Sequence, residues 1–345
     1  MSASLRDVAG LAGVSIKTVS NVVNGYPHVR ASTRDRVVAA LEQLNYRPNV
    51  TARNLRKGRT GIVALAVPEL DIPYFAELAR CVIKAAAERS FTVLVDQTDG
   101  RLDREAVVLG GIRHQLIDGL IFSPIASGSA EFTARGDATP MVLLGERVPD
   151  DAGTGGALSV DHVAIDNVTA AYDATTHLAA LGRERIAAIG VQESSNGATA
   201  HQRLRGYRRA LEEADLTSDP ALLGPAAWYH RTDGAHAMAV LLDSGARPDA
   251  VFCFSDLLAL GAMRTALDRG LRVPEDVAII GFDDADDGRY STPTLSTIAP
   301  DKERIAAVAV ELLAARIDGG PGAAPRDVHT PYSLLAREST LGRGG

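Results

Sequence analysis

The chain has 345 residues, a length typical of two or three domains with ample core. Its 46% hydrophobic and 23% charged residues describe a globular protein and exclude a mainly disordered one. No apolar run approaches the roughly 20 residues of a membrane span, and the N-terminus has no signal-peptide pattern. Cys81 and Cys253 form neither a disulfide framework nor a zinc site. We therefore expect two small buried cysteines, no membrane partner and a cytoplasmic protein.

The net charge of −7 hides an asymmetry between the ends of the chain. Residues 1–60 hold ten Lys/Arg and three Asp/Glu, a balance of +7, whereas the remainder holds 26 bases and 40 acids, a balance of −14. A basic head on an acidic body is typical of a DNA-binding protein with a separate regulatory domain. The alternative is a solvated basic face with no partner.

Residues 5–25 predict two short helices joined by a tight turn. The first has an apolar face at helical spacing, formed by Leu5, Val8, Ala9 and Ala12. Gly13 can end this helix, and Ser15 can cap the second. Val19, Val22 and Val23 point inward, which leaves the start of the second helix outside. A helix-turn-helix reads DNA with that part, although an ordinary helical hairpin has the same pattern.

A third helix and a basic segment follow. Ser32 is expected to open the third helix, with Asp35 as a capping-box-like partner. Pro48 then marks a break, and residues 49–56 could add about two helical turns. Because so short a helix is unstable alone in water, we expect this segment to order only against a partner.

From Gly61 onward, apolar runs of strand length alternate with amphipathic helical stretches. The expected strands are 62–67, 91–95, 120–123, 141–144, 163–165, 186–191, 251–254 and 277–282. The expected helices are 76–89, 104–115, 168–181, 203–214, 234–243 and 257–269. Nearly continuous apolar strands between helices predict parallel sheet covered on both faces, and around eight strands suit two doubly wound lobes.

Short motifs stand in a fixed order along the whole chain. They include Asp7-Val8-Ala9, Ala12-Gly13-Val14-Ser15, Thr18-Val19-Ser20, Val23-Asn24-Gly25, Asn45-Tyr46-Arg47-Pro48-Asn49, Ala52-Arg53-Asn54-Leu55, Pro73-Tyr74-Phe75, Ile165-Asp166-Asn167, Ile280-Gly281-Phe282-Asp283-Asp284 and Arg337-Glu338-Ser339. In their order and spacing the chain resembles the lactose/galactose repressor (LacI/GalR) family of bacterial transcription regulators.

The resemblance implies a domain plan. It comprises an α-helical helix-turn-helix headpiece at 1–48, a hinge helix and linker at 49–60, and an α/β core of two doubly wound lobes like type I periplasmic binding proteins. The N-terminal lobe would comprise 61–165 plus 294–327, and the C-terminal lobe 166–293 plus 328–345. The chain would cross between the lobes near residues 166, 293 and 327. In some members of the family, leucine heptads at the C-terminus hold the protein as a tetramer. This chain ends without such heptads, so a homodimer is expected.

The resemblance also implies a set of DNA contacts. Bases in the major groove would be read by Ile16, Lys17 and Asn21; the family often has Arg at the last position, so the base read there stays open. Phosphates would be held by Ser4, Ser15, Thr18, Ser20, Asn24 and Thr33. Ala52 and Leu55 would act in the minor groove, with Leu55 wedged into a central base step. The partner would be a double-stranded, pseudo-palindromic operator.

A small-molecule effector is implied in the cleft between the lobes. Open parallel sheets bind ligands beyond the carboxyl ends of their strands, and Ser123, Ser255 and Asp283 each follow an expected strand. The residues that match the family's pocket are Tyr74, Phe75, Arg203, Tyr229 and Asp283. Arg203 and Asp283 match the family's polyol-binding pair, and either Trp228 or Tyr229 matches its stacking aromatic, with Tyr229 favoured. Asp284, Asp286 and Asp287 are expected to form a solvated acidic loop rather than a metal site.

These features predict a repressor whose operator affinity is set by a sugar or related polyol. A nucleoside- or purine-responsive regulator of the same architecture is the alternative, followed by a sugar-binding protein that does not bind DNA. An enzyme is not expected, because the chain has no phosphate-binding loop, nucleophile elbow or strand-linked dinucleotide motif. No cofactor or metal is expected either.

Overall fold

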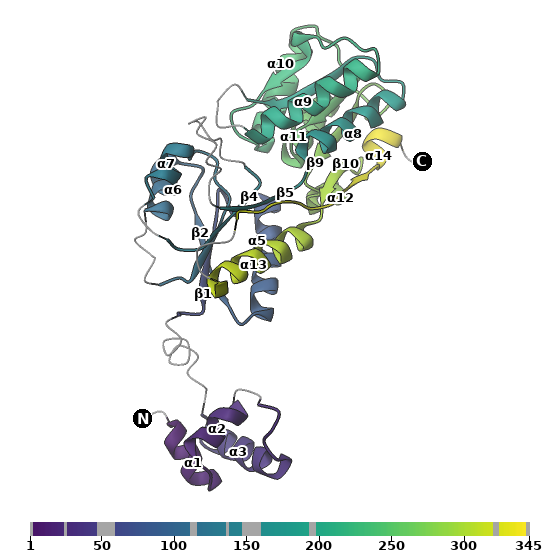
Figure 1. The fold of residues 1–345 in the computed structure, drawn as a ribbon. Coiled ribbons are helices and arrows are strands. Elements are labelled where there is room, and N and C mark those ends of the chain that lie inside the picture. The colour runs from purple at the N-terminus through teal and green to yellow at the C-terminus, as the bar shows by residue number, and fades with distance from the viewer. Residues whose placement is uncertain are drawn as a thin grey trace. The chain divides into compact units, whose positions relative to one another are not determined.

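A computed structural model describes residues 3–23, 26–46, 59–110, 116–135, 138–146, 160–192, 198–319 and 324–342. The chain forms two compact units, Met1–Gly61 and Ile62–Gly345 (Figure 1). The first is helical, and the second contains two six-stranded sheets.

Three helices form the first unit: α1 (Leu5–Ala12), α2 (Ile16–Val23) and α3 (Ala31–Gln43). Ser4 caps α1 reciprocally, because its hydroxyl accepts from the N–H of Asp7 at 3.3 Å while the Asp7 carboxylate accepts from the N–H of Ser4 at 2.8 Å. Gly13 ends α1 at φ 64°, a conformation that costs glycine little. Val8, Val19 and Val37 are fully buried and form the core of this unit.

The third helix begins at Ala31 with Arg30 as its N-cap, two residues before the expected cap at Ser32. The carbonyl of Arg30 accepts from the N–H groups of Thr33 and Arg34, both at 3.0 Å, so Ser32 already lies inside the first turn. The expected start at Ser32 with Asp35 as its capping partner is therefore wrong. The expected hinge helix at 49–56 lies outside the described residues.

The first sheet of the second unit has strands in the order β11-β5-β4-β3-β1-β2, all parallel. They are β1 (Ile62–Val67), β2 (Thr92–Gln97), β3 (Gly119–Phe122), β4 (Met141–Leu144), β5 (Asp161–Ala164) and β11 (Asp327–His329). Helices α5 (Pro73–Glu88) and α13 (Lys302–Gly319) pack together on one face, and α6 (Leu102–Leu109) and α7 (Ser129–Thr133) cover the other (Figure 1). We call this half of the core the first lobe.

The second sheet has the order β12-β10-β9-β8-β6-β7 and defines the second lobe. Its strands are β6 (Ile186–Val191), β7 (Leu223–Pro225), β8 (Ala250–Cys253), β9 (Ala278–Phe282), β10 (Ser296–Pro300) and β12 (Tyr332–Leu335). Its helices are α8 (Asn167–Ala180), α9 (Ala198–Glu213), α10 (Arg231–Asp243), α11 (Asp256–Asp268), α12 (Asp286–Tyr290) and α14 (Glu338–Leu341). All of its strand pairs are parallel except β10 with β12.

This pairing moves two of the expected lobe crossings. Ser296 pairs with Ile280 of β9, so the chain stays in the second lobe until Pro300 rather than leaving it near residue 293. Residues 294–300 therefore do not belong to the first lobe. Likewise β11 pairs with β5 in the first sheet, so the last crossing follows His329 and not residue 327.

All eight expected strands are present, with ends shifted by at most two residues, and both cysteines are buried. Four short strands were not expected: β7, β10, β11 and β12. The long helix α13 was missed as well. In the part of the chain that the structure describes, no helix is long and apolar enough to cross a membrane.

Asp161, the first residue of β5, ties the first lobe together. It is fully buried, and its carboxylate accepts from Arg316 Nε and Nη2 at 2.9 and 2.8 Å and from the N–H of Arg326 at 2.7 Å. Burial opposes its charge, but these hydrogen bonds outweigh burial and lower its pKa. One carboxylate thus links β5, α13 and the segment before β11.

Replacing Asp161 with Asn should lower the free energy of unfolding at pH 7 by about 2–4 kcal/mol, because Arg316 then loses its buried counter-charge. The lowered pKa means that this contribution is present above the unfolded-state pKa of about 4 and is lost as the pH falls through the folded-state value. Urea unfolding at pH 7 and pH 3.5 measures both effects. Asp268→Asn, which removes an exposed carboxylate paired with Arg264, is the control and should change little. Equal stability of the two variants would refute the assignment.

Candidate functional site

A cavity of about 180 Å³ lies between the first and second lobes. Its polar walls come from residues that follow parallel strands, where such sheets bind ligands. The structure brings all seven expected effector residues to this cavity: Tyr74, Phe75, Ser123, Arg203, Tyr229, Ser255 and Asp283. The structure shows that these seven residues line one cavity. Their contact with an effector remains a prediction.

Arg203 of α9 is buried and held by three neighbours in the second lobe. Its Nε donates to Asn167 Oδ1 at 3.0 Å, and its Nη1 donates to the carbonyl of Phe254. The guanidinium carbon lies 3.5 Å from the centre of the Phe282 ring, in cation–π geometry. These bonds use two of the five N–H donors of a guanidinium and fix its plane.

Asp283 follows β9, is half-buried, and has a strained backbone conformation. Its φ of 114° is unusual for a residue with a side chain, and its N–H donates to the carbonyl of Ile298 at 2.8 Å. Burial raises the pKa of its carboxyl to about 6, although Arg203 and Lys302 pull it down. No hydrogen bond joins this carboxylate to another described residue. A strained backbone and an acid with a raised pKa are typical of a binding site.

Aromatic side chains form the less polar wall. Tyr74 and Phe75 begin α5 and pack edge to face, with ring centres 5.2 Å apart. The Tyr229 hydroxyl donates to the carbonyl of Gly190 at 2.8 Å, which fixes its ring. Burial raises the pKa of both Tyr74 and Tyr229. Flat faces of this kind suit the apolar side of a sugar or a base.

The two serines differ in their surroundings. Ser255 caps α11, since its hydroxyl accepts from the N–H of Leu258 at 3.2 Å, so it has a structural role whether or not it binds an effector. Ser123 is buried just after β3, and its N–H donates to the carbonyl of Ala66 at 3.0 Å. Both therefore lie at fixed strand ends.

Sequence reasoning missed Glu146, which lies two residues after β4 and lines the cavity. Its Oε2 accepts from the N–H of Thr199 in the second lobe at 2.9 Å. Burial raises the pKa of this carboxyl. The strand-end rule that identified Ser123 and Asp283 applies to Glu146 as well and would have found it.

Trp228 lines the cavity beside Tyr229, so both candidate stacking aromatics are present. Its ring is parallel to that of His230, at 6.2 Å between centres. His230 Nε2 in turn lies 2.8 Å from Glu69 Oε2 of the first lobe. This chain of contacts closes one side of the cavity.

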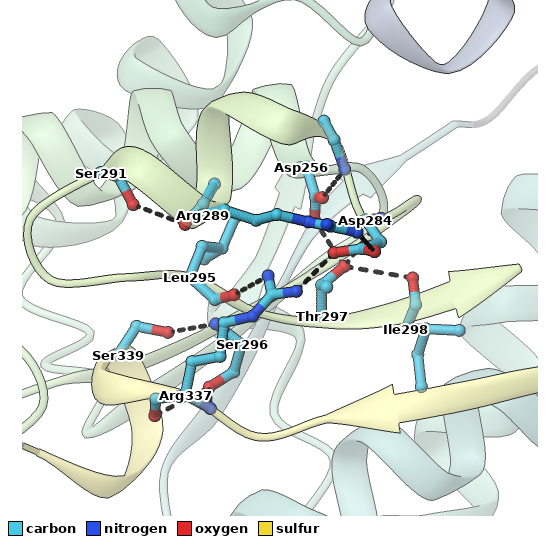
Figure 2. A network of polar contacts seen from close by, with 12 residues as sticks. Asp256, Asp284, Arg289, Ser291, Leu295, Ser296, Thr297, Ile298, Arg337 and Ser339 are labelled. Carbon is cyan, nitrogen blue, oxygen red and sulfur yellow. Dashed lines mark hydrogen bonds and ion pairs between the residues drawn. The ribbon is translucent and has the colours of Figure 1, made fainter. Parts of the chain in front are cut away.

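A polar network surrounds Asp284, the residue that follows Asp283 in the sequence (Figure 2). Arg289 and Arg337 converge on the Asp284 carboxylate, each at 2.5 Å. The pKa of Asp284 is lowered, because these two guanidinium groups outweigh its burial. Asp284 is thus a buried, paired acid and not part of a solvated loop as expected. Asp286 and Asp287 are exposed, as expected.

Asp256 lies in the same network and is buried. It accepts from Thr297 Oγ1 and from the N–H of Ala285, both at 2.7 Å. Burial, with the nearby charge of Asp283, raises its pKa strongly. In the part of the chain that the structure describes, no group of His, Cys, Asp or Glu is arranged to hold a metal ion.

In the first unit, the start of α2 is open to solvent. Ile16 is 44% exposed, Lys17 is exposed and Asn21 is partly exposed. Ser15 caps α2: its Oγ accepts from the N–H of Thr18 at 3.1 Å and lies 2.9 Å from Thr18 Oγ1. The expected cap is confirmed, and base contacts by the exposed side chains remain predictions.

The residues expected to contact phosphates differ in their exposure and in their existing hydrogen bonds. Ser4 is engaged with Asp7 as the cap of α1, with its Oγ 2.7 Å from Asp7 Oδ2. Ser20 and Thr33 are half-buried on α2 and α3. Asn24, together with the expected minor-groove residues Ala52 and Leu55, lies outside the described residues.

A helix-turn-helix unit joined to a two-lobed core with a polar interlobe cavity defines a class of ligand-controlled DNA-binding regulators. Residues 4–49 match the family described as bacterial regulatory proteins, lacI family, and residues 175–340 match the periplasmic binding protein-like domain.

Individual relatives extend this match to the full length. The chain is 32% identical over 344 residues to the HTH-type transcriptional regulator DegA of Bacillus subtilis, covering 99% of this chain and 98% of DegA. It is similar to the transcriptional regulator CelR in its cellobiose complex (31% identity, TM-score 0.72, 98% and 99% coverage). It is also similar to the lac repressor dimer bound to operator and the anti-inducer ONPF (27% identity, TM-score 0.80, 99% and 100% coverage).

The chain therefore belongs to the lacI family of bacterial regulatory proteins. It is a DNA-binding transcriptional regulator and not an enzyme. The resemblance read from the ordered motifs is confirmed, and so is the predicted architecture of a helical headpiece with an α/β core of two lobes.

Asp283→Asn should stabilise the protein at pH 7.5 by up to about 3 kcal/mol, because the ionised acid is desolvated in the fold and asparagine is not. The raised pKa means that Asp283 contributes stability below its ordinary pKa and loses it as the pH rises through about 6. The advantage of the variant should therefore nearly vanish at pH 4. Urea unfolding at both pH values measures it, with the exposed Asp286→Asn as the control. Lower stability of Asp283→Asn at pH 7.5 would contradict the cause given for the raised pKa.

Proposed function

We propose that this protein is a homodimeric repressor whose affinity for a pseudo-palindromic operator is set by a sugar or related polyol bound between the lobes. Asp283 carries this proposal, because its desolvated carboxylate lies beside Arg203 and receives no hydrogen bond from the described residues. An acceptor and a fixed donor side by side match the vicinal hydroxyls of a polyol. The cellobiose bound by CelR supports the same class.

The aromatic wall supports a second effector class. Trp228, Tyr229 and Phe75 offer planar faces to the same cavity, and a nucleoside or purine base stacks on such faces. Arg203 and Asp283 would then bind the ribose or the base edge. These two classes of effector differ in ring chemistry, and a binding screen that contains both sugars and nucleosides distinguishes them.

On the DNA side, we propose that Ile16, Lys17 and Asn21 read bases and that Leu55 enters the minor groove. The capped, solvent-facing start of α2 supports base reading in the major groove. The lac repressor dimer bound to operator supports a two-fold arrangement for this chain. We place its activity in the cytoplasm, where such an operator lies.

An effector screen tests the first proposal. Thermal-shift measurements on the full chain with monosaccharides, disaccharides and nucleosides should identify a ligand that raises the Tm. Asp283→Asn should weaken its binding about 10–100-fold, because a charged hydrogen-bond acceptor is lost. The affinity of a polyol should also fall as the pH drops below about 6 and Asp283 becomes protonated. Isothermal titration checks both, with Asp286→Asn as the control; unchanged binding by Asp283→Asn would exclude this site.

Leu55→Ala tests the minor-groove assignment. Loss of the wedge should weaken operator binding about tenfold or more and leave effector binding unchanged. A duplex selected from randomised pseudo-palindromic sequences serves as the operator in gel-shift titrations. Leu11→Ala, which truncates a 47% exposed leucine of α1, is the matched control. Equal operator affinity of wild type and Leu55→Ala would rule out the wedge.

A further inference from the structure

Glu105, on α6 of the first lobe, is a fully buried acid that the proposed function does not use. Acidic side chains are almost never fully buried unless they are paired. Its Oε1 accepts from the N–H of Ile125 at 2.8 Å, and its Oε2 accepts from the N–H of Ser127 at 2.7 Å. The N–H of Ala126 lies between them, 3.2 and 3.1 Å from the two oxygens. Three successive backbone donors around one carboxylate form an anion-binding nest.

The nest belongs to a loop that forms part of the effector cavity. This loop, residues 123–128, joins β3 to α7, and both Ser123 and Ile125 line the cavity. Pro124 has no N–H to donate, and the Oγ of Ser127 is buried with no partner among the described residues. The Glu105 carboxylate is therefore a polar anchor shared by all three residues 125–127.

The other end of this anchor leads to a second loop of the cavity wall. Helix α6 begins two residues after Gly100, which has a φ of 58°. A Cβ on Gly100 would lie 3.2 Å from the Trp228 ring and 3.7 Å from Ile125 Cβ. The loops that carry Gly100 and Ile125 thus lie together under a tryptophan of the second lobe.

We propose that Glu105 is a positioning residue of the effector pocket: its carboxylate fixes the 123–128 loop to α6, and so sets the surface on which Trp228 closes. This inference rests on the proposed function for its meaning in binding. The geometry that it asserts can be tested without any effector.

Trp228 is the only tryptophan of the chain, so its emission reports this contact directly. Glu105→Ala removes the four atoms of an acetate, namely Cγ and the carboxylate group. We expect the full-length variant to show red-shifted Trp228 emission and stronger acrylamide quenching than wild type. Sodium acetate should reverse both changes by occupying the nest, whereas acetamide and sodium chloride at equal concentration should not.

The control is Asp103→Asn, which removes an exposed carboxylate from the same turn of α6 and should leave Trp228 emission unchanged. Glu105→Gln provides a milder variant in case Glu105→Ala does not fold. Its amide keeps one acceptor and opposes the nest with an N–H₂ group, so we expect a Tm about 3–8 °C lower together with a red shift. Far-UV circular dichroism verifies that each variant is folded.

Two outcomes would overturn the proposal. A folded Glu105→Ala with wild-type emission and quenching would show that the carboxylate does not set the Trp228 contact. A Glu105→Gln variant with a lower Tm but unchanged emission would reduce Glu105 to a purely structural residue. Neither outcome bears on whether the protein binds a polyol, and a failed effector screen would leave the acetate rescue unaffected, so the two failures are distinguishable.

Discussion

Parallel strand order is the constraint on which the rest of this structure depends. Parallel strands bring their carboxyl ends to one edge of a sheet, and here the two sheets bring those edges to one cavity. Ser123 and Glu146 come from the first sheet, and Ser255 and Asp283 from the second. Residues far apart in the sequence therefore meet without any local signal between them. Among the strands that the structure describes, the only antiparallel pair is β10 with β12, which lies at the outer edge of the second sheet.

Two neighbouring acids of the site have opposite electrostatic surroundings. Asp283 faces the cavity with a raised pKa, while Asp284 is paired with Arg289 and Arg337 and has a lowered one. The carbonyl of Asp284 also accepts from Lys302 Nζ of the first lobe at 3.1 Å. A ligand that changes the charge or backbone of Asp283 thus acts one residue from a contact between the lobes, which is a physical route by which binding can influence their arrangement.

Prediction from sequence succeeded for elements whose pattern depends on neighbouring residues. It failed for elements whose burial on several sides, or whose distant partners, cannot be seen in the local sequence. The capped turn at Gly13 and Ser15 and the apolar strands are dictated by nearby residues. Helix α13 was missed because it buries residues on several sides, which erases the amphipathic period. Strand β10 is short and partly polar, so the lobe crossing after it could not be placed. From sequence alone, an acid such as Glu105 is expected on the surface. The structure shows that it is buried with three backbone N–H donors around its carboxylate.

Each lobe holds its own wall of the interlobe pocket in place through contacts within that lobe. In the second lobe Asn167 and the Phe254 carbonyl fix Arg203, and in the first lobe Glu105 fixes the loop of Ile125. The polar contacts between the lobes include His230 with Glu69, Thr199 with Glu146, and Lys302 with the carbonyl of Asp284. The His230 side chain is 40% exposed, and partly exposed pairs add little free energy. A ligand that touches both walls and binds one arrangement of the lobes more tightly than another shifts the balance between them by that difference in affinity, which is what a ligand-controlled regulator requires.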